Sequence, residues 1–148
     1  MAIKDTTRKP YIEDNDENIF IGIDLPFRKS NGIEGYFAST STTIEAVKNN
    51  IRNLVNTHEG ERLMQPQLGM NLRKYLFEQF SDETVFSIQN DIVDTFRNWL
   101  PFVEIQDIQV NMSSINDSIG KNTMNVTIIF NITQDPNTLE SVSIEIGE

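Results

Sequence analysis

The sequence predicts an α+β fold in which an antiparallel three-stranded sheet or meander packs on two main helices plus a short helix, preceded by an extended N-terminal arm. Three observations support this prediction. Two amphipathic helical patterns lie in the middle of the chain, three segments of alternating apolar residues follow them, and no regular pattern precedes them. Because helical and strand patterns are segregated along the chain, we expect helices to cover one face of an antiparallel sheet.

The first 42 residues are predicted to form the arm, and residues 43–148 to form the α+β domain. Gly and Ser residues punctuate the arm, and no helical period is sustained in it. Four aromatic side chains argue against a purely solvated tail: Phe20, Phe27, Tyr36 and Phe37. The arm either wraps its own core or docks on a neighbouring protein, and the sequence leaves both interpretations open.

The first main helix is predicted over residues 43–56. Its apolar residues recur at helical spacing and form one stripe: Ile44, Val47, Ile51, Leu54 and Val55. Thr42 or Thr43 is a suitable N-cap, and Glu45 places a carboxylate in the first turn, where the helix dipole favours it. Gly60 is expected to break the helix at its C-terminal end.

The segment between the two main helices is expected to be extended over residues 61–70. Pro66 has no N–H group to donate to a ladder, so this segment is at best an edge strand. Gly69 marks a turn or a close backbone approach. Asn71 is suited to cap a short helix over residues 72–79.

The second main helix is predicted over residues 82–100. Ser81 supplies a capping hydroxyl, and two carboxylates follow in the first turn. Its apolar stripe is the most regular in the chain: Val85, Ile88, Ile92, Phe96 and Trp99. Pro101 ends this helix, because the residue before a proline disfavours the helical conformation.

The C-terminal third of the chain alternates with a period of two. Val103 and Ile105 alternate in one phase and Ile108 and Val110 in the other, so we predict a β-bulge near Asp107. A polar turn over residues 113–122 is followed by a strictly alternating strand over 124–132. A turn over 134–137 then leads to a last short strand over 142–146.

The charge and residue content exclude several classes of function. The formal net charge of -10 argues against a general nucleic-acid binder and against binding to an anionic membrane; it favours solubility, with docking to basic partners as the alternative. With no Cys and one His, disulfides and an ordinary zinc site are excluded. No apolar run approaches the roughly 20 residues that span a bilayer. We expect no metal, no cofactor, and a protein made in the cytoplasm.

Three carboxylates near the centre of the chain are candidates for the hydrolysis of a sugar polymer: Glu59, Glu61 and Glu78. A glycosidase needs two carboxylates across a cleft, and nothing in the sequence marks a cleft. Exposed charge or ion pairing with Arg62 and Arg73 is the favoured interpretation. His58 has no second His or Cys with which to form an ordinary triad or metal site.

Arg62 follows the predicted turn at Gly60, where a guanidinium can bridge backbone carbonyls and a carboxylate. It is interpreted either as an internal clamp to the helix that carries Glu78 or as a contact with a partner. We favour the clamp, because a loop with special backbone positions needs internal ties.

Two further regions are candidates for partner binding. At the end of the second main helix, Trp99 is most simply a core residue, and Pro101 and Phe102 are suited to a surface contact. The C-terminal strands leave an edge that is either an ordinary one blunted by Glu145 and Glu148 or the site where a partner strand is added. The strand residues assigned to this contact are Val126, Ile128, Val142, Ile144 and Ile146.

The stretch after the first helix resembles the small wedge protein of contractile phage-tail baseplates, a family that includes the type VI secretion protein TssE. The family pattern is Thr-x-x-Gly-Glu-Arg, a Pro, a Phe/Leu-Gly step, Leu, then Leu-Phe-Glu. It is matched in order by Thr57, Gly60, Glu61, Arg62, Pro66, Leu68, Gly69, Leu72, Leu76, Phe77 and Glu78. The resemblance covers residues 42–148, and Leu100-Pro101-Phe102 stands where many members carry Glu-Pro-Arg. We expect a structural clamp formed by Gly60, Glu61, Arg62, Pro66, Gly69, Leu72, Phe77 and Glu78.

The resemblance implies a non-enzymatic wedge subunit in the tail baseplate of the virion. Its implied partners are the tail sheath protein, other wedge proteins, and tail-tube or hub-proximal proteins, with six copies per tail. Its C-terminal strands are expected to initiate the sheath. Some relatives have been labelled tail lysozymes, so the alternative is a peptidoglycan hydrolase that uses Glu61 and Glu78. A third interpretation is an adaptor, because the family also contains a stress-response anti-adaptor.

Overall fold

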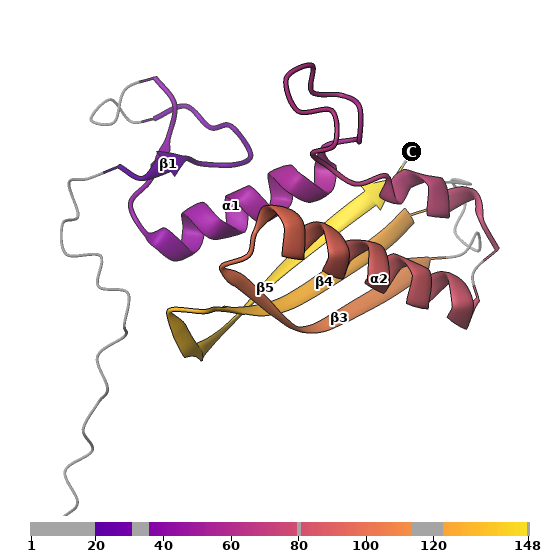
Figure 1. Ribbon diagram of the computed structural model, residues 1–148. Coiled ribbons are helices and arrows are strands. Elements are labelled where there is room, and N and C mark those ends of the chain that lie inside the picture. The colour runs from indigo at the N-terminus through magenta and orange to yellow at the C-terminus, as the bar shows by residue number, and fades with distance from the viewer. Residues whose placement is uncertain (1–19, 31–35, 80, 114–122, 148) are drawn as a thin grey trace, which may run out of the picture.

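The computed structural model describes residues 20–30, 36–79, 81–113 and 123–147. Its main body is a three-stranded antiparallel sheet with helices packed on one face (Figure 1). The strands follow the order β3-β4-β5, which is a meander. Their bounds are Val103–Ser113 for β3, Thr123–Ile132 for β4 and Asp135–Gly147 for β5. The predicted α+β meander is confirmed, while Glu148 and most of the predicted turn over 113–122 lie outside the described residues.

Helix α1 (Thr43–Asn56) begins and ends with local hydrogen bonds. The Thr42 hydroxyl accepts from the backbone N–H of Glu45 at 3.4 Å, so the predicted N-cap and both bounds are confirmed. At the other end, Thr57 is extended and its N–H donates to the Asn53 carbonyl at 3.0 Å. The prediction that Gly60 breaks the helix is therefore wrong, because the chain leaves the helix before Gly60.

Helix α2 (Asp82–Trp99) also begins at its predicted cap, where the Ser81 hydroxyl accepts from the Thr84 N–H at 3.2 Å. It ends one residue earlier than predicted, at Trp99. The short helix between α1 and α2 is the 3-10 helix η1 (Leu72–Phe77). The Asn71 side chain makes no capping hydrogen bond to it, so that part of the prediction is wrong.

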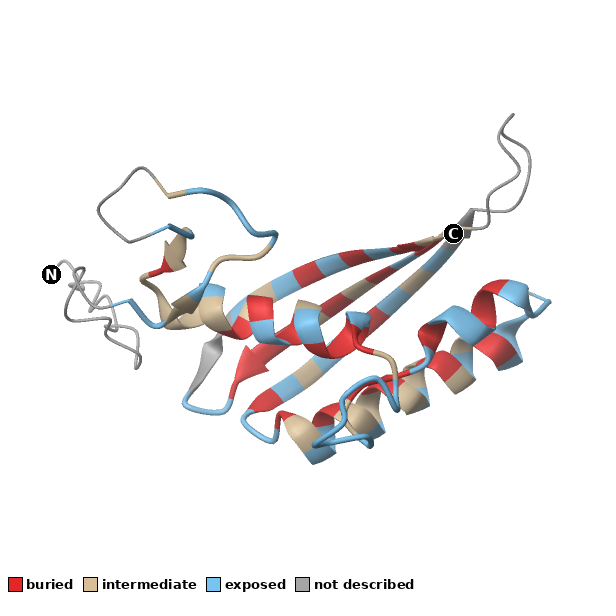
Figure 2. Cartoon of the chain, turned by 90° about the horizontal axis from the view of Figure 1, so that it is seen from above, coloured by how far each residue is buried: buried red, intermediate tan, exposed pale blue. Residues whose placement is uncertain are grey.

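The core lies between the two helices and one face of the sheet. Figure 2 shows buried and exposed residues alternating along the strands, with the buried faces of α1 and α2 turned toward the sheet. The residues with at most 1% exposure come from both layers: Ile51, Ile88, Ile92, Phe96, Met124, Val126, Ile128 and Phe130. Each such side chain contributes about 1.5–3 kcal/mol relative to full exposure, so this contact holds the two layers together.

The predicted bulge in β3 is confirmed. Ile105 is opposite Phe130, and Asp107 is opposite Ile129, so Gln106 is the extra residue on β3. The bulge returns Ile108 to the face of the sheet on which Val103 is buried. It also interrupts the regular edge of β3.

The last strand is longer than predicted, because β5 begins at Asp135. Phe130 is opposite Glu140 and Ile132 is opposite Asp135, so the pairing of β5 with β4 is irregular before Glu140. The turn between β4 and β5 falls on Thr133 and Gln134 rather than on the predicted 134–137.

The described part of the arm forms a second, two-stranded antiparallel sheet. Its strands are β1 (Gly22–Ile23) and β2 (Ser39–Thr40), and β2 contacts α1. The arm therefore folds back on its own domain over these residues, as one of the two interpretations expected. The remainder of the arm, residues 1–19 and 31–35, lies outside the described residues.

Candidate functional site

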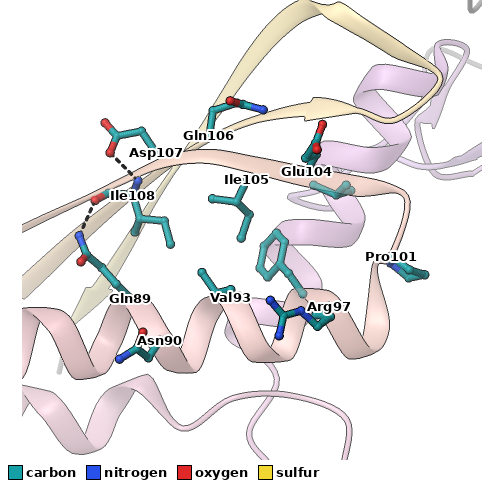
Figure 3. A pocket seen from close by; sticks show the side chains of 12 residues that line it. Gln89, Asn90, Val93, Arg97, Pro101, Glu104, Ile105, Gln106, Asp107 and Ile108 are labelled. Atoms are coloured by element: carbon teal, nitrogen blue, oxygen red, sulfur yellow. Dashed lines mark hydrogen bonds between the residues drawn. The ribbon is translucent and has the colours of Figure 1, made fainter.

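The outer edge of β3 faces α2 across a groove of about 680 Å³ (Figure 3). The Gln89 side-chain amide donates to the carbonyl of Ile108 at 2.9 Å. The Asp107 carboxylate accepts a hydrogen bond from the N–H of Ile108 at 2.9 Å. The backbone N–H and C=O groups of Ile108, which point away from β4, are therefore both hydrogen-bonded to side chains. The bulge at Gln106 lies two residues before Ile108. At Ile108, next to the bulge, this edge is protected against the addition of another strand.

The outer edge of β5 is regular by comparison. Residues 140–147 pair with β4 without a register shift. Ile108 is opposite Ile128 on β4, and its backbone groups point away from β4, so the backbone groups of Ile128 point toward β5 instead. On β5, Val142 is opposite Ile128. The backbone of Val142 therefore bonds to β4, and alternate residues of β5 face outward.

Three residues of β5 direct their backbone N–H and C=O groups to the free edge by this alternation: Ser141, Ser143 and Glu145. Their side chains are exposed, on the sheet face opposite the helices. Two polar side-chain contacts reach β5 from other elements: the Ser143 and Thr127 hydroxyls lie 3.1 Å apart, and Lys48 of α1 pairs with Glu140 at 2.8 Å. Neither involves the outward backbone groups, and among the described residues no hydrogen bond from another element reaches those groups. The sheet thus has one protected edge and one edge whose backbone groups are available.

The strand side chains predicted to bind a partner are in the core instead. Val126 and Ile128 are fully buried, and β4 is paired on both sides, so it offers neither side chains nor a backbone edge. Val142, Ile144 and Ile146 are between 2% and 6% exposed. The prediction is wrong for these side chains, because the even-numbered residues of β5 face the helices. Along residues 140–147, β5 offers a partner the backbone groups and the exposed side chains of its odd-numbered residues.

The end of α2 presents a small exposed surface. Trp99 is partly buried and packs against the core, and Leu100 is buried at 8% exposure. Pro101 is exposed, and Phe102 is 40% exposed. The Phe102 carbonyl accepts from the Thr133 N–H at 3.0 Å, which ties this surface to the turn between β4 and β5.

The segment between α1 and η1 is a succession of turns, so the predicted extended segment over 61–70 is wrong. Its ends are closed by the Gly60 N–H, which donates to the Pro66 carbonyl at 2.7 Å, and by the Met70 N–H, which donates to the Thr57 carbonyl at 2.9 Å. Gly69 has a φ of +121°, and a Cβ there would lie 2.4 Å from the Thr57 carbonyl oxygen. The predicted close backbone approach at Gly69 is confirmed.

Arg62 is not tied to the segment that carries Glu78. Its guanidinium donates to the Asn53 side-chain oxygen on α1 at 3.4 Å. Glu61 has an internal role instead, because its carboxylate accepts from the His58 N–H at 3.0 Å. Of the remaining predicted clamp residues, Leu72 is buried, whereas Phe77 and Glu78 are exposed.

A polar network that sequence reasoning missed joins η1 to α2. The Tyr75 hydroxyl donates to the Asp91 carboxylate at 2.6 Å, and Lys74 pairs with the same oxygen at 3.1 Å. Burial, and secondly the bond to Asp91, raises the pKa of Tyr75. The bond to Asp91 raises the pKa of Lys74. The partners are 16 and 17 residues apart in the chain, and no local pattern joins them.

The arrangement of the central carboxylates gives no support to hydrolysis. Glu61 is engaged by the His58 N–H, and Glu78 follows the last residue of η1. Neither Glu61 nor Glu78 lines any of three hollows in the described part of the chain, whereas Glu59 lines one of them together with Asp91 and Asp94. Within the described ranges, no group of three His, Asp or Glu side chains could hold a metal ion. No helix formed by described residues is long and apolar enough to cross a membrane.

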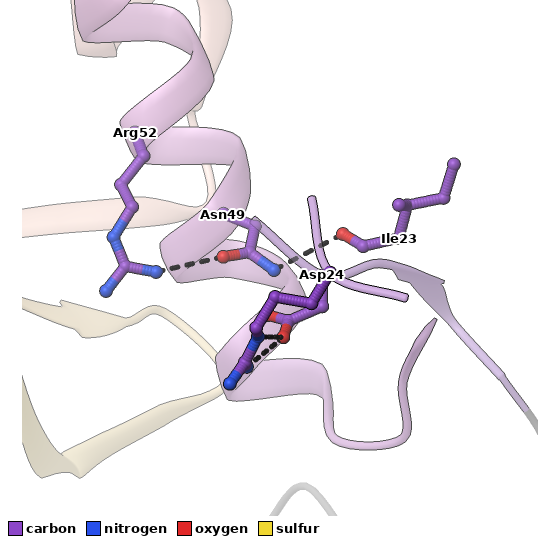
Figure 4. A network of polar contacts seen from close by, with 5 residues as sticks. Ile23, Asp24, Asn49 and Arg52 are labelled. Carbon is purple, nitrogen blue, oxygen red and sulfur yellow. Dashed lines mark hydrogen bonds and ion pairs between the residues drawn. The ribbon is translucent and has the colours of Figure 1, made fainter. Parts of the chain in front are cut away.

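The arm is fastened to α1 by a buried amide (Figure 4). The Asn49 side chain, 5% exposed, donates to the Ile23 carbonyl at 3.3 Å and accepts from Arg52 at 2.9 Å. Arg28 pairs with Asp24 in the same part of the arm and lowers the pKa of that carboxyl. Despite this attachment, three aromatic rings stay between 48% and 70% exposed: Phe27, Tyr36 and Phe37, of which Phe37 contacts the other two.

Comparison with known proteins shows a match along most of this domain. The family described as baseplate wedge protein gp25 matches residues 41–137, which is more than half of the chain. Among curated proteins, the baseplate wedge protein gp25 of Enterobacteria phage T4 is 26% identical over 109 residues, which cover 74% of this chain and 79% of the T4 protein.

Two solved structures share the fold. A chain in the baseplate of the anti-feeding prophage has a TM-score of 0.60 and 23% identity, covering 75% of this chain and 83% of its own length. A protein named as a tail lysozyme from Geobacter sulfurreducens has a TM-score of 0.56 and 22% identity, covering 72% of this chain and 92% of its own length. At these identities the likeness concerns the fold alone.

Proposed function

We propose, from the premise that this chain belongs to the gp25 family of baseplate wedge proteins, that it joins the wedge core to the first layer of the tail sheath. As a member of this family it is a structural protein of the baseplate of a contractile phage tail. The more specific proposal is that it templates sheath assembly by accepting a sheath strand on the outer edge of β5.

The difference between the two sheet edges is the observation that supports this proposal. Strand addition depends on unpaired backbone groups along a regular edge. Ser141, Ser143 and Glu145 offer such groups, whereas those of Ile108 on β3 are held by Gln89 and Asp107. In this proposal a sheath strand beside β5 extends the sheet on that side only, and the first sheath layer starts from that strand.

The test is a proline at the centre of this edge. Ser143→Pro removes one outward N–H and leaves the β4–β5 ladder paired, because prolines are tolerated at edge positions. Ser143→Ala is the matched control, since it removes the same hydroxyl and keeps the N–H. We expect tails carrying Ser143→Pro to lack sheath and those carrying Ser143→Ala to be normal by electron microscopy. Full-length sheaths on folded Ser143→Pro tails would refute the proposal.

A point variant is needed because β5 contributes side chains to the core. Removal of the C-terminal strand would also remove Val142, Ile144 and Ile146, which are buried, and would unfold the domain. Thermal unfolding of purified Ser143→Pro and Ser143→Ala checks that the two variants are comparably folded.

We further propose that the arm binds a neighbouring wedge protein through Phe27, Tyr36 and Phe37, whose exposed rings sit on a segment fastened to α1. Six copies per tail would follow from a sixfold baseplate. Replacing the three residues with Ser should reduce recovery of this chain in isolated baseplates and leave the fold of residues 43–148 unchanged.

A hydrolytic role is the weaker candidate, suggested by the likeness to a protein named as a tail lysozyme. The engagement of Glu61 by the His58 N–H argues against it. Incubation of the purified chain with peptidoglycan should release no more soluble fragments than a heat-inactivated sample. Release that is lost in Glu61→Gln or Glu78→Gln would restore the hydrolase interpretation.

A further inference from the structure

The loop between α1 and η1 carries two large apolar side chains at its tip that are almost entirely exposed. Leu63 is 97% exposed and Met64 is 94% exposed. The other exposed large hydrophobic residues in the described part of the chain reach at most 70%. Figure 1 shows this loop projecting from the end of α1, away from the sheet.

This tip is held in place by the loop's own hydrogen bonds. The Gln65 N–H donates to the Arg62 carbonyl at 3.2 Å, directly across Leu63 and Met64. The contact between Gly60 and Pro66 closes the base at 2.7 Å. A preformed loop loses little conformational freedom when it binds, which favours its use as a recognition element.

The surroundings of the tip are acidic and polar. Glu59 and Glu61 are exposed on one side, and the Arg62 guanidinium is turned toward Asn53. A hollow of about 650 Å³ beside the base of the loop is lined by three carboxylates, Glu59, Asp91 and Asp94, and by one cation, Lys74, which pairs with Asp91. The acidic net charge of -10 extends this character to the whole chain.

We propose that Leu63 and Met64 form an apolar knob that inserts into a socket on another protein of the baseplate, with Lys or Arg side chains around the socket. A convex apolar tip needs a concave apolar partner, and the exposed Glu59 and Glu61 complement basic groups. The same charge disfavours an anionic lipid surface. This contact is separate from the strand addition proposed at β5 and goes beyond it.

The test replaces the two apolar residues of the knob with aspartate and compares this variant with a second one that carries the same added charge elsewhere in the loop. Leu63→Asp with Met64→Asp removes the apolar tip, whereas Gln65→Asp with Gln67→Asp adds the same charge at exposed neighbours. Each is co-expressed with the unmodified chain, and the ratio of the two in purified baseplates is measured by mass spectrometry. We expect incorporation of the first variant to fall at least about tenfold and that of the second to be unchanged.

Equal incorporation of both variants would overturn the proposal. A benzophenone amino acid at position 64, illuminated in assembled baseplates, should cross-link to an apolar segment of another baseplate protein flanked by Lys or Arg. Cross-links to lipid, or vesicle binding that the first variant loses, would instead assign the tip to a membrane. Because the measure is incorporation and not sheath length, failure here leaves the proposed sheath contact untouched.

Discussion

Replacement of Gly69 by alanine tests how the loop after α1 is held. Gly69 has a φ of +121°, which a residue with a Cβ adopts at a cost of about 1–2 kcal/mol. The added Cβ would also lie 2.4 Å from the carbonyl oxygen and 2.9 Å from the carbonyl carbon of Thr57. Both atoms belong to the backbone, so no side-chain rotation can relieve the contact.

Relief of this contact requires the two backbone segments to separate. The Met70 N–H would then lose its bond to the Thr57 carbonyl, now 2.9 Å long, which contributes about 0.5–1.5 kcal/mol. Together these terms predict a loss of about 1.5–3.5 kcal/mol in the free energy of unfolding for Gly69→Ala. The corresponding fall in melting temperature is about 3–14 °C for a chain of this length.

Gly60→Ala is the matched control. Gly60 also has a positive φ, of +89°, but a Cβ there would meet no heavy atom within 4 Å. We expect it to lose only the conformational term of about 1–2 kcal/mol. Chemical denaturation of both variants measures the difference. Equal destabilisation would show that the approach of Gly69 to Thr57 is not what fixes the loop.

Other perturbations give equally direct predictions. Gln89→Ala combined with Asp107→Ala should free the outer edge of β3, so this double variant should form edge-paired dimers by analytical ultracentrifugation at concentrations where the unmodified chain does not. The same mass for the double variant and the unmodified chain at all concentrations would contradict the edge protection. Tyr75→Phe should lower the free energy of unfolding by about 1.5 kcal/mol, because it removes a hydrogen bond to a carboxylate. Since the folded-state pKa values of Tyr75 and Lys74 are both raised, their contribution is present below about pH 10 and is lost as the pH rises through those values. Tyr75→Phe should therefore show a shallower alkaline loss of stability, and identical slopes would refute this assignment.

The features that sequence could predict are those set by neighbouring residues. Thr42 and Ser81 define the helix starts because a capping hydroxyl acts within one turn. The bulge at Gln106 follows from the change of phase between Ile105 and Ile108. In each case a short stretch of chain contains all the information needed.

The features that it could not predict depend on contacts between distant segments. Gln89 protects the edge of β3 from 19 residues away, and Asn49 fastens the arm to α1 from 26 residues away. The sequence predicts an extended segment over 61–70, and the turns found there depend on the bond from the Met70 N–H to the Thr57 carbonyl, 13 residues away. The exposed tip did have a local signal: two large apolar residues, Leu63 and Met64, stand next to each other in a stretch rich in turn-forming residues.

The central claim is that the outer edge of β5 receives the sheath, and cross-linking on intact tails tests it most directly. A zero-length reagent that joins carboxylates to amines suits this edge, because Glu145 is exposed there and residues 140–147 contain no lysine. We predict links from Glu145 to lysines of the sheath protein. Sheath links from Glu104 or Asp107 on β3, with none from Glu145, would contradict the account.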